Sequence, residues 1–269
     1  MWQNSGKGEN VARIIAVANQ KGGVGKTTTA VSLAACLAEP REQGGPGRRV
    51  LLVDCDPQGN ATSGFGIDKG ALEQSVYDVL IDKVPASQVL VPTEFAVDVL
   101  PANIQLAGAE VELVSAIARE TRLKKALAEV EQDYDFIIID CPPSLGLLTL
   151  NGLTAAQTVL MPIQCEFYAL EGVSQLMNTI NLVRDGLNPE LGIEGIVMTM
   201  YDSRTRLGAD VVAKVRENFG DALYDTMIPR TVRLSEAPSY GQPIIYYESK
   251  SKGAEVYRQL AREVLKRGQ

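Results

Sequence analysis

The feature that most constrains this chain is a segment rich in glycine and lysine that directly follows a short apolar run. The apolar residues between Arg13 and Ala18 predict a buried strand, and the segment Asn19-Gln20-Lys21-Gly22-Gly23-Val24-Gly25-Lys26-Thr27-Thr28-Thr29 leads from it into a helical pattern. Glycines allow successive backbone N–H groups to surround an anion, and the dipole of the following helix adds to the attraction. The order strand, loop, helix therefore predicts a phosphate-binding loop.

Two side chains of this loop have specific expected roles. Lys26 is predicted to reach the β- and γ-phosphates of a nucleotide, and the Thr27 hydroxyl to bind magnesium. The usual pattern G-x-x-x-x-G-K-[ST] is not met, because Gln20 stands at its first glycine and a second lysine, Lys21, follows. The alternative, a glycine-rich turn with incidental lysines, does not account for the strand and helix on either side. The predicted nucleotide-binding residues are Lys21, Gly22, Gly23, Val24, Gly25, Lys26, Thr27 and Thr28.

Acidic residues end two further apolar runs. The run that begins at Val50 ends in Asp54-Cys55-Asp56, and Phe136-Ile-Ile-Ile ends in Asp140. Carboxylates at the carboxyl ends of parallel strands can hold Mg²⁺ beside a phosphate loop, and a carboxylate near the γ-phosphate can orient the attacking water. The alternative is that these acids simply begin turns after the strands.

The rest of the chain alternates short apolar runs with helical patterns. Predicted strands span 14–18, 50–53, 97–100, 136–139, 159–163, 193–200 and 223–228, and predicted helices span 28–38, 106–118, 122–132, 170–184, 208–219 and 253–266. Continuous apolar strands separated by helices are typical of a parallel sheet covered on both faces. We therefore expect one α/β domain over residues 13–269, with a doubly wound, mostly parallel sheet. Residues 1–12 are expected to form a flexible tail, and residues 40–49 a surface loop.

Composition excludes several kinds of site. The chain has no histidine, so histidine-based triads and histidine–metal sites are ruled out. Its four cysteines show no paired or metal-binding spacing and lie in or beside apolar runs, which favours reduced core residues. No apolar run reaches the roughly 18–20 residues of a membrane-spanning helix, and the polar start of the chain does not resemble a secretion signal. A reducing cytoplasm is the expected location.

Charge is unevenly distributed along the chain. The net charge is −7, but residues 196–269 contain 12 lysines and arginines against 9 acidic residues. This difference is compatible with a basic face on an acidic body, and equally with ordinary solvated charges.

The motifs together resemble one known family. The segments K-G-G-V-G-K-T-T, D-x-D-P-Q-G-N-A-T and D-x-P-P-S are similar to those of the ParA/MinD superfamily of ATPases, whose phosphate loop (Walker A motif) is called deviant. Further segments resemble the chromosomal, Soj-type ParA branch, and the match covers roughly residues 13–265. These further segments are Tyr168-Ala-Leu-Glu-Gly172, Thr199-Met-Tyr-Asp202 and the stretch from Ile228 to Pro238.

The resemblance implies a role for each matching residue. Lys21 would cross a dimer interface to the nucleotide of the partner, and Gly22 would lie where two subunits approach closely. Lys26 would bind phosphate within its own subunit, Asp56 would be needed for hydrolysis, and Asp140 would serve magnesium. The implied catalytic residues are Lys21, Lys26 and Asp56, and the implied metal residues are Thr27, Asp56 and Asp140. The adenine would lie near Met200, Pro229 and Arg230.

The resemblance also implies partners and a reaction. The family members bind ATP and Mg²⁺, form nucleotide-dependent homodimers and bind double-stranded DNA without sequence preference. A ParB-type centromere-binding protein stimulates their slow ATP hydrolysis, which releases the DNA, so the protein would be associated with the nucleoid. The arginines that match the DNA-binding role are Arg204 and Arg233, and secondary candidates are Arg230, Lys250 and Lys252. Phosphate contacts of this kind carry no base readout.

Two other functions remain open at the sequence level. A MinD-like, membrane-associated spatial regulator would need an amphipathic anchor at its carboxyl end. The last predicted helix has apolar residues at helical spacing, which fit packing on the core better. A metal-cluster carrier would need paired cysteines, and Cys141 beside Asp140 has no evident partner. The opening dozen residues are too few for the helix-turn-helix domain of larger ParA proteins, so an operator-binding role is not expected.

Overall fold

The computed structural model describes residues 12–40, 44–166 and 169–267, with the side chains of 169–172 excluded. The expected flexible tail at 1–12 lies almost entirely outside this range, as do three residues of the expected loop at 40–49. The described remainder of that loop, residues 40 and 44–49, forms neither helix nor strand.

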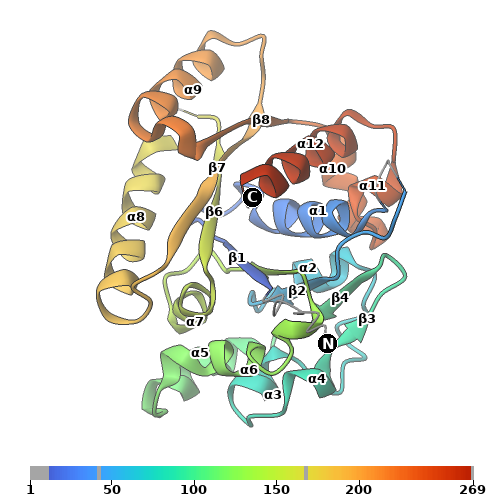
Figure 1. Cartoon of the computed structure of the whole chain (residues 1–269), viewed down its shortest axis with the longest axis vertical. Coiled ribbons are helices and arrows are strands. Elements are labelled where there is room, and N and C mark those ends of the chain that lie inside the picture. Colours follow the sequence, from blue (N-terminus) through green and yellow to red (C-terminus); the bar gives the residue numbers. More distant parts are fainter. Residues whose placement is uncertain (1–11, 41–43, 167–168, 268–269) are drawn as a thin grey trace, which may run out of the picture.

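An eight-stranded sheet runs through the centre of the described structure (Figure 1). Its strand order is β3-β4-β2-β5-β1-β6-β7-β8, and every neighbouring pair is parallel except β3 with β4. The strands are β1 (Arg13–Val17), β2 (Val50–Asp54), β3 (Val91–Pro92), β4 (Val97–Leu100), β5 (Phe136–Asp140), β6 (Thr158–Gln164), β7 (Gly192–Tyr201) and β8 (Leu223–Pro229). The prediction of a mostly parallel, doubly wound α/β fold is confirmed.

Helices connect the strands and cover the sheet. The α-helices are α1 (Lys26–Ala38), α2 (Asn60–Gly64), α3 (Val76–Leu80), α4 (Ala86–Val89), α5 (Leu106–Glu112), α6 (Arg122–Leu127), α7 (Leu147–Ala155), α8 (Ala169–Gly186), α9 (Arg206–Phe219), α10 (Val232–Glu236), α11 (Ile244–Tyr247) and α12 (Lys252–Arg267). Short 3₁₀ helices are η1 (Leu113–Ser115), η2 (Arg119–Thr121), η3 (Glu131–Asp133), η4 (Gly220–Ala222) and η5 (Ala237–Tyr240).

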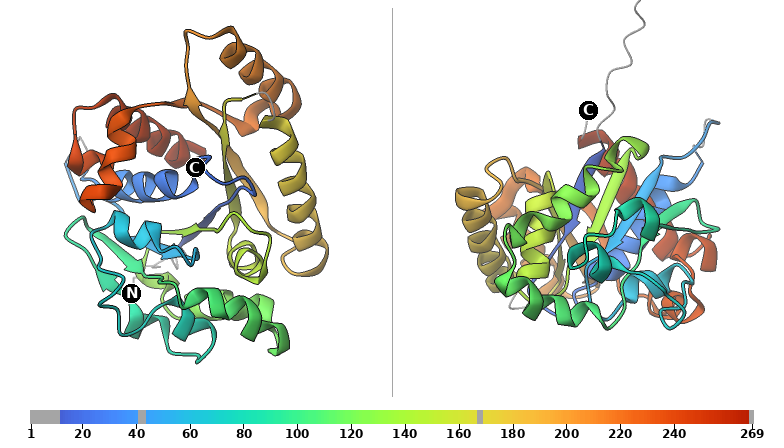
Figure 2. Two further views of the ribbon diagram at one scale, coloured as in Figure 1. Left: turned by 180° about the vertical axis from the view of Figure 1, so that it is seen from behind. Right: turned by 90° about the horizontal axis from the view of Figure 1, so that it is seen from below.

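The two faces of the sheet bury two separate hydrophobic clusters. On β1, Ile14 and Ala16 pack with residues of α5, α6, α7 and α8, whereas Ile15 and Val17 pack with residues of α1 and α12. Strand side chains point alternately to opposite faces, so both sets must be apolar when helices cover both faces. Figure 2 shows the strands between these two helical layers in the view from below.

Two predicted helices differ from the structure. The pattern from 106 to 118 continues past the end of α5, where the chain instead forms η1 and then turns at Ala118, whose φ is 52°. The pattern from 122 to 132 likewise outruns α6, which ends at Leu127. Leu113, Leu123 and Leu127 are fully buried, so tertiary packing, rather than helical periodicity, determines the path of this segment.

The carboxyl ends of the central strands meet at one edge of the sheet. Asp54 at the end of β2 is the register partner of Asp140 at the end of β5, and Asp140 is the register partner of Val17 on β1. We call this the carboxyl edge. Because the glycine-rich loop follows β1, the fold places that loop beside both aspartates.

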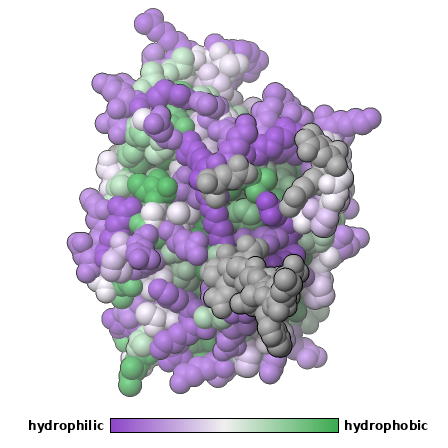
Figure 3. Space-filling view, in the orientation of Figure 1, coloured by the Kyte–Doolittle hydropathy of each residue, from purple (hydrophilic) through white to green (hydrophobic). Residues whose placement is uncertain are grey.

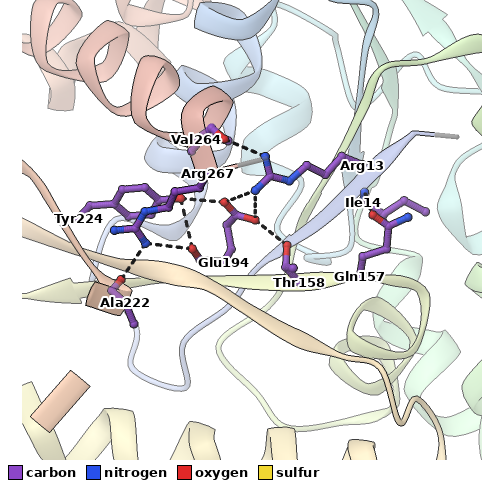
Figure 4. Close-up of polar contacts among 9 residues, drawn as sticks. All are labelled: Arg13, Ile14, Gln157, Thr158, Glu194, Ala222, Tyr224, Val264 and Arg267. Carbon is purple, nitrogen blue, oxygen red and sulfur yellow. Dashed lines mark hydrogen bonds and ion pairs between the residues drawn. The ribbon is translucent and has the colours of Figure 1, made fainter. Parts of the chain in front are cut away.

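The opposite, amino edge is held by a buried polar network (Figure 4). Both carboxylate oxygens of Glu194 accept bonds of 2.6 Å from the Arg13 guanidinium, while Thr158 and Tyr224 each donate to Glu194 over 2.8 Å. The Arg267 guanidinium lies 3.8 Å from the centre of the Tyr224 ring. These contacts tie strands β1, β6, β7 and β8 to the end of α12.

Candidate nucleotide-binding site

The loop between β1 and α1 has the backbone geometry that an anion site requires. Gly23 and Gly25 adopt φ values of 74° and 88°, which residues with a Cβ rarely adopt. Gly25 is the N-cap of α1, and no side chain caps this helix, so its first N–H groups remain available to a ligand. The loop thus presents unpaired donors at a helix N-terminus.

Two polar side chains outside the predicted set hold the loop in place. Asn19 donates to the carbonyl of Pro162 over 2.7 Å and accepts from the N–H of Lys21 over 3.0 Å. Thr199 donates to the carbonyl of Val24 over 2.8 Å. Neither residue was predicted from the sequence to have a role. Asn19 precedes the lysine directly and Thr199 opens one of the family segments, so position beside a motif was the available signal.

Lys26 lies inside the loop, 7% exposed, and its Nζ donates to the carbonyl of Lys21 over 3.0 Å. Burial lowers the pKa of Lys26, and the nearby carboxylates of Asp140 and Asp56 act in the opposite direction. A buried ammonium needs anionic neighbours to remain charged, and a phosphate in the loop would supply further negative charge. Its position is consistent with the predicted phosphate contact.

Lys21, by contrast, lies at the surface. Its side chain is 44% exposed and forms an ion pair with Glu166 of the same chain. A Cβ built on Gly22 would meet no described atom of the chain within 4 Å. Packing within the subunit therefore does not explain the glycine. The two lysines of the loop occupy different environments, one inside the site and one facing outward.

Asp54 and Asp56 have different environments although they are neighbours in the sequence. Asp54 is fully buried and accepts from the N–H of Asp56 at 3.1 Å and from the N–H and hydroxyl of Thr62 at 2.8 and 2.7 Å. Thr62 also accepts from the N–H of Ala102. Asp54 thus fixes the turn that carries Asp56, a supporting role that the sequence did not reveal. Asp56 accepts from the N–H of Gln58 over 2.9 Å.

Asp140 is fully buried, and neither carboxylate oxygen has a hydrogen-bond partner of good geometry among the described residues. Burial and the adjacent Asp54 raise the pKa of Asp140 well above its usual value, while Thr27 and Lys26 act in the opposite direction. Buried polar groups without partners are rare in folded proteins and often belong to ligand or metal sites. Asp140 beside Thr27 therefore fits the predicted magnesium site.

The described residues contain no cluster of three or more acidic or cysteine side chains that could hold a metal alone. Mg²⁺ usually keeps water and substrate phosphate oxygens among its ligands and takes few from the protein. Thr27 and Asp140 would hold the ion, with Asp56 nearby. When bound, the ion would neutralise the phosphate oxygens.

A cavity of about 300 Å³ adjoins the loop at Gly25 and Thr28. Met200, Pro229 and Arg230 line it, so the structure brings together the three residues predicted to lie near the adenine. Met200 adopts a φ of 53°, an uncommon backbone conformation for a residue with a side chain. Their contact with a base remains a prediction.

The residues predicted to bind DNA lie at the surface, but the two principal arginines are paired. Arg204 donates to both carboxylate oxygens of Asp202 over 2.9 and 2.8 Å, which lowers the pKa of Asp202 to about 2. Arg233 forms a 3.0 Å ion pair with Glu236. Each would have to share its guanidinium with a phosphate. The secondary candidates Arg230, Lys250 and Lys252 are exposed.

The apolar side of α12 is committed to the core. Val256, Tyr257, Leu260 and Val264 are buried in the cluster shared with α1, as the sequence pattern indicated. No described helix is both long enough and apolar enough to cross a membrane. The described cysteines are free, with Cys55 and Cys141 buried. Burial of its apolar side on the core leaves α12 without the exposed apolar face that an amphipathic membrane anchor requires.

A parallel sheet with a glycine-rich loop between its central strand and a helix, and with acidic residues at the ends of the adjacent strands, defines a P-loop nucleoside triphosphate-binding protein. Comparison with known proteins identifies the family within this class to which the chain belongs. Residues 12–193 match a family described as an AAA domain.

Several full-length relatives are similar over nearly the whole chain. The sporulation initiation inhibitor protein Soj of Bacillus subtilis is 59% identical over 96% of this chain and 100% of its own length. The chromosome partitioning protein ParA of Myxococcus xanthus is 54% identical over 97% of this chain and 92% of its own. The chain therefore belongs to the ParA/MinD superfamily of deviant Walker A ATPases, within its chromosomal, Soj-type ParA branch.

Solved structures agree with this placement. A Mycobacterium smegmatis protein described as cobyrinic acid a,c-diamide synthase, with a bound ATP analogue and magnesium, is 47% identical over 96% of both chains with a TM-score of 0.83. The cell division ATPase MinD of Pyrococcus furiosus is 26% identical over 95% of this chain and 99% of its own, with a TM-score of 0.76. The descriptions name different activities, but both structures share the fold found here.

Proposed function

We propose that this protein is an ATP-dependent DNA-partitioning ATPase whose assembly is controlled by its nucleotide. In this proposal ATP and Mg²⁺ bind at the carboxyl edge, two subunits associate face to face, and the dimer binds double-stranded DNA without sequence preference. Slow hydrolysis, stimulated by a ParB-type partner, releases the DNA. The nucleoid of the cytoplasm would be its place of action.

The contrast between the two loop lysines is the observation that carries the proposal. Lys26 is buried beside its own phosphate site, whereas Lys21 faces outward, beside a glycine that has open space around it. A cation that reaches the nucleotide of a second subunit stabilises phosphate charge only when two subunits meet. ATP would then stabilise the dimer, and loss of the γ-phosphate would weaken it.

Hydrolysis would use Asp56 and its supporting residues. Asp54 holds the turn that carries Asp56, and Asp56 lies next to the buried carboxylate of Asp140 at the same edge. A carboxylate in this position can orient a water molecule toward the γ-phosphate, while Lys26 and magnesium offset the charge that develops on the phosphate oxygens.

DNA binding would depend on assembly. The two principal candidates, Arg204 and Arg233, are each paired with an acidic neighbour. One subunit would therefore bind weakly, and joining two such surfaces would raise the affinity through effective concentration. This couples nucleotide state to DNA binding without any change in the DNA contacts themselves.

The test is binding of the purified chain to an arbitrary DNA duplex with ATP, with ADP and without nucleotide, at two salt concentrations. Binding only with ATP, falling steeply with salt, is the expected result. Arg233→Glu should weaken that binding while leaving ATP-dependent dimerisation intact, and Lys124→Glu, the reversal of an exposed charge on α6, should leave both unchanged. Equal binding in all three nucleotide states would contradict the proposal.

A further inference from the structure

A second hollow lies away from the nucleotide site. It has a volume of about 460 Å³ and lies between the end of α3 and the connection from η1 to α6. None of the residues that line it also lines the cavity beside the loop. Figure 1 places α3 and α6 together at the lower end of the molecule, below the sheet.

The apolar part of this hollow includes a side chain that is almost completely exposed. Val79 and Val84 form part of its lining, and Ile117 stands at its rim with 92% of its surface exposed. Val114, three residues earlier in the chain, is 59% exposed. Figure 3 shows hydrophobic surface at the lower-left tip of the molecule, where the segment after α5 ends in Figure 1. Large apolar side chains exposed around a hollow are typical of interaction sites.

The charged part of the hollow is basic. Lys83, Arg122 and Lys125 line it against a single carboxylate, Glu129. Neither lysine forms an ion pair with any described residue, on a chain whose net charge is −7. An acidic ligand would be repelled by much of this protein and attracted here.

Arg122 connects the two sides of the hollow and still has hydrogen-bond donors available for a ligand. Its Nη1 donates to the carbonyls of Leu80 and Ile81 at the end of α3, over 2.8 and 3.3 Å. Its other guanidinium nitrogens have no partner among the described residues. A guanidinium fixed on one side in this way can present the remaining donors to a carboxylate without losing much freedom.

The backbone around the hollow is also unusual. Lys83 and Ala118, which both line it, adopt φ values of 59° and 52°. Only four described residues other than glycine have positive φ, and a third, Met200, lines the cavity beside the loop. Such conformations cost energy and tend to occur at functional positions, so the hollow shares this feature with the nucleotide site.

We propose that this hollow is a docking site for an acidic, amphipathic segment of a partner protein. Apolar side chains of that segment would cover Ile117 and enter between Val79 and Val84, while its carboxylates would meet Lys83, Arg122 and Lys125. A nucleic acid would satisfy the cations but would leave Ile117 exposed beside its phosphates. The combination of apolar and basic groups therefore selects a protein ligand.

The experiment selects peptides from a random display library on the full-length chain, with counter-selection on the double variant Ile117→Ser/Lys125→Glu. Enriched peptides should carry aspartate or glutamate beside apolar anchors. Each single substitution should weaken a selected peptide about tenfold or more, because each removes one buried contact of the complex. Matched controls are Leu182→Ser and Lys214→Glu, exposed positions on α8 and α9, which should leave the affinity unchanged.

Three results would overturn the inference. The first is that peptides are enriched no more strongly on the original chain than on the double variant, and the second is that the enriched peptides are basic. The third is that duplex DNA displaces a bound peptide, which would identify the hollow as a nucleic-acid site. Ile117 and Lys125 are both exposed, so the double variant should unfold at the same temperature as the original chain. The selection uses the chain without nucleotide, so its outcome is independent of the DNA-binding test.

Discussion

The two edges of the sheet each bury a carboxylate, and the two carboxylates differ in their hydrogen-bond partners. At the amino edge, Glu194 accepts bonds from Arg13, Thr158 and Tyr224, and its side chain is 1% exposed. At the carboxyl edge, Asp140 is equally buried but has no partner of good geometry among the described residues.

This difference separates a structural role from a functional one. A buried carboxylate with a full set of hydrogen-bond donors holds the elements that supply those donors together. Removing the carboxylate leaves its donors without a partner, which destabilises the fold. A buried charge without donors is unfavourable in the empty protein and becomes favourable only when a cation arrives. Contacts at the amino edge therefore stabilise the fold, whereas the carboxyl edge is available to bind a ligand.

The largest effect is expected from Glu194→Ala. The substitution leaves the partly buried Arg13 guanidinium without its partner, which should lower the free energy of unfolding by about 3 kcal/mol. Chemical denaturation measures this change, and Glu217→Ala, an exposed position on α9, is the matched control. ATP affinity of the folded fraction should be unchanged. A loss of affinity without a loss of stability would contradict the division between the edges.

Lys26→Ala should show the reverse pattern. It removes charge-assisted bonds to phosphate worth about 1.5–3 kcal/mol each, so ATP affinity should fall roughly 100-fold or more. Calorimetric titration with ATP and Mg²⁺ measures this, with Lys214→Ala, an exposed lysine on α9, as control. Stability of the nucleotide-free chain should not fall, since burial already disfavours the charged form of Lys26. Retained nucleotide affinity would remove the basis of the site assignment.

Asp140→Asn should stabilise the empty protein by about 1–3 kcal/mol while it abolishes the magnesium dependence of ATP binding. The pKa of Asp140 is raised on folding, so the folded chain keeps a proton that the unfolded chain has already released. Stability therefore decreases as pH rises above about 4, the unfolded pKa, toward the raised folded value. The asparagine variant should lose this contribution. Thermal unfolding at several pH values would measure it, and an unchanged slope would contradict the prediction.

Tyr224→Phe should give the smallest effect, a loss of about 0.5–1.5 kcal/mol from the single bond to Glu194. Glu194 keeps Arg13 and Thr158 in this variant, and the ring beneath Arg267 remains. Denaturation of the variant, alone and combined with Thr158→Val, shows whether the two donors act together. A loss as large as that of Glu194→Ala would mean that the network cannot tolerate any change.

The sequence alone was enough to predict the mostly parallel sheet, apart from its short edge strand β3. Strands such as Phe136-Ile-Ile-Ile-Asp140 are continuously apolar because both faces are covered, and that pattern has few alternatives. The glycine-rich loop has a local sequence signature. The spatial adjacency of Asp54 and Asp140 follows from the rule that parallel strands end at one edge. The roles of the individual site residues remain predictions to be tested by substitution.

Other features depend on contacts between distant segments. The N-terminus of α7, a helix that was not predicted, is capped by Glu110 of α5, which accepts from the N–H groups of Leu147 and Leu148. No local pattern reveals such a cap. The same holds for the Glu194 network and for the support that Asp54 gives to Asp56, because their donors come from separate parts of the chain. The two-residue strand β3 is too short to leave a pattern.

The bond from Arg13 to the carbonyl of Val264 spans 251 residues and has a consequence for how the protein is made. During synthesis the central strand leaves the ribosome early, but the helix that covers it emerges only after every other strand. Until then Ile15 and Val17 lack the α12 part of their cluster. The nascent chain must therefore remain protected from aggregation for most of its translation. The phosphate loop, which is held by Thr199, can reach its final geometry only after β7 has emerged.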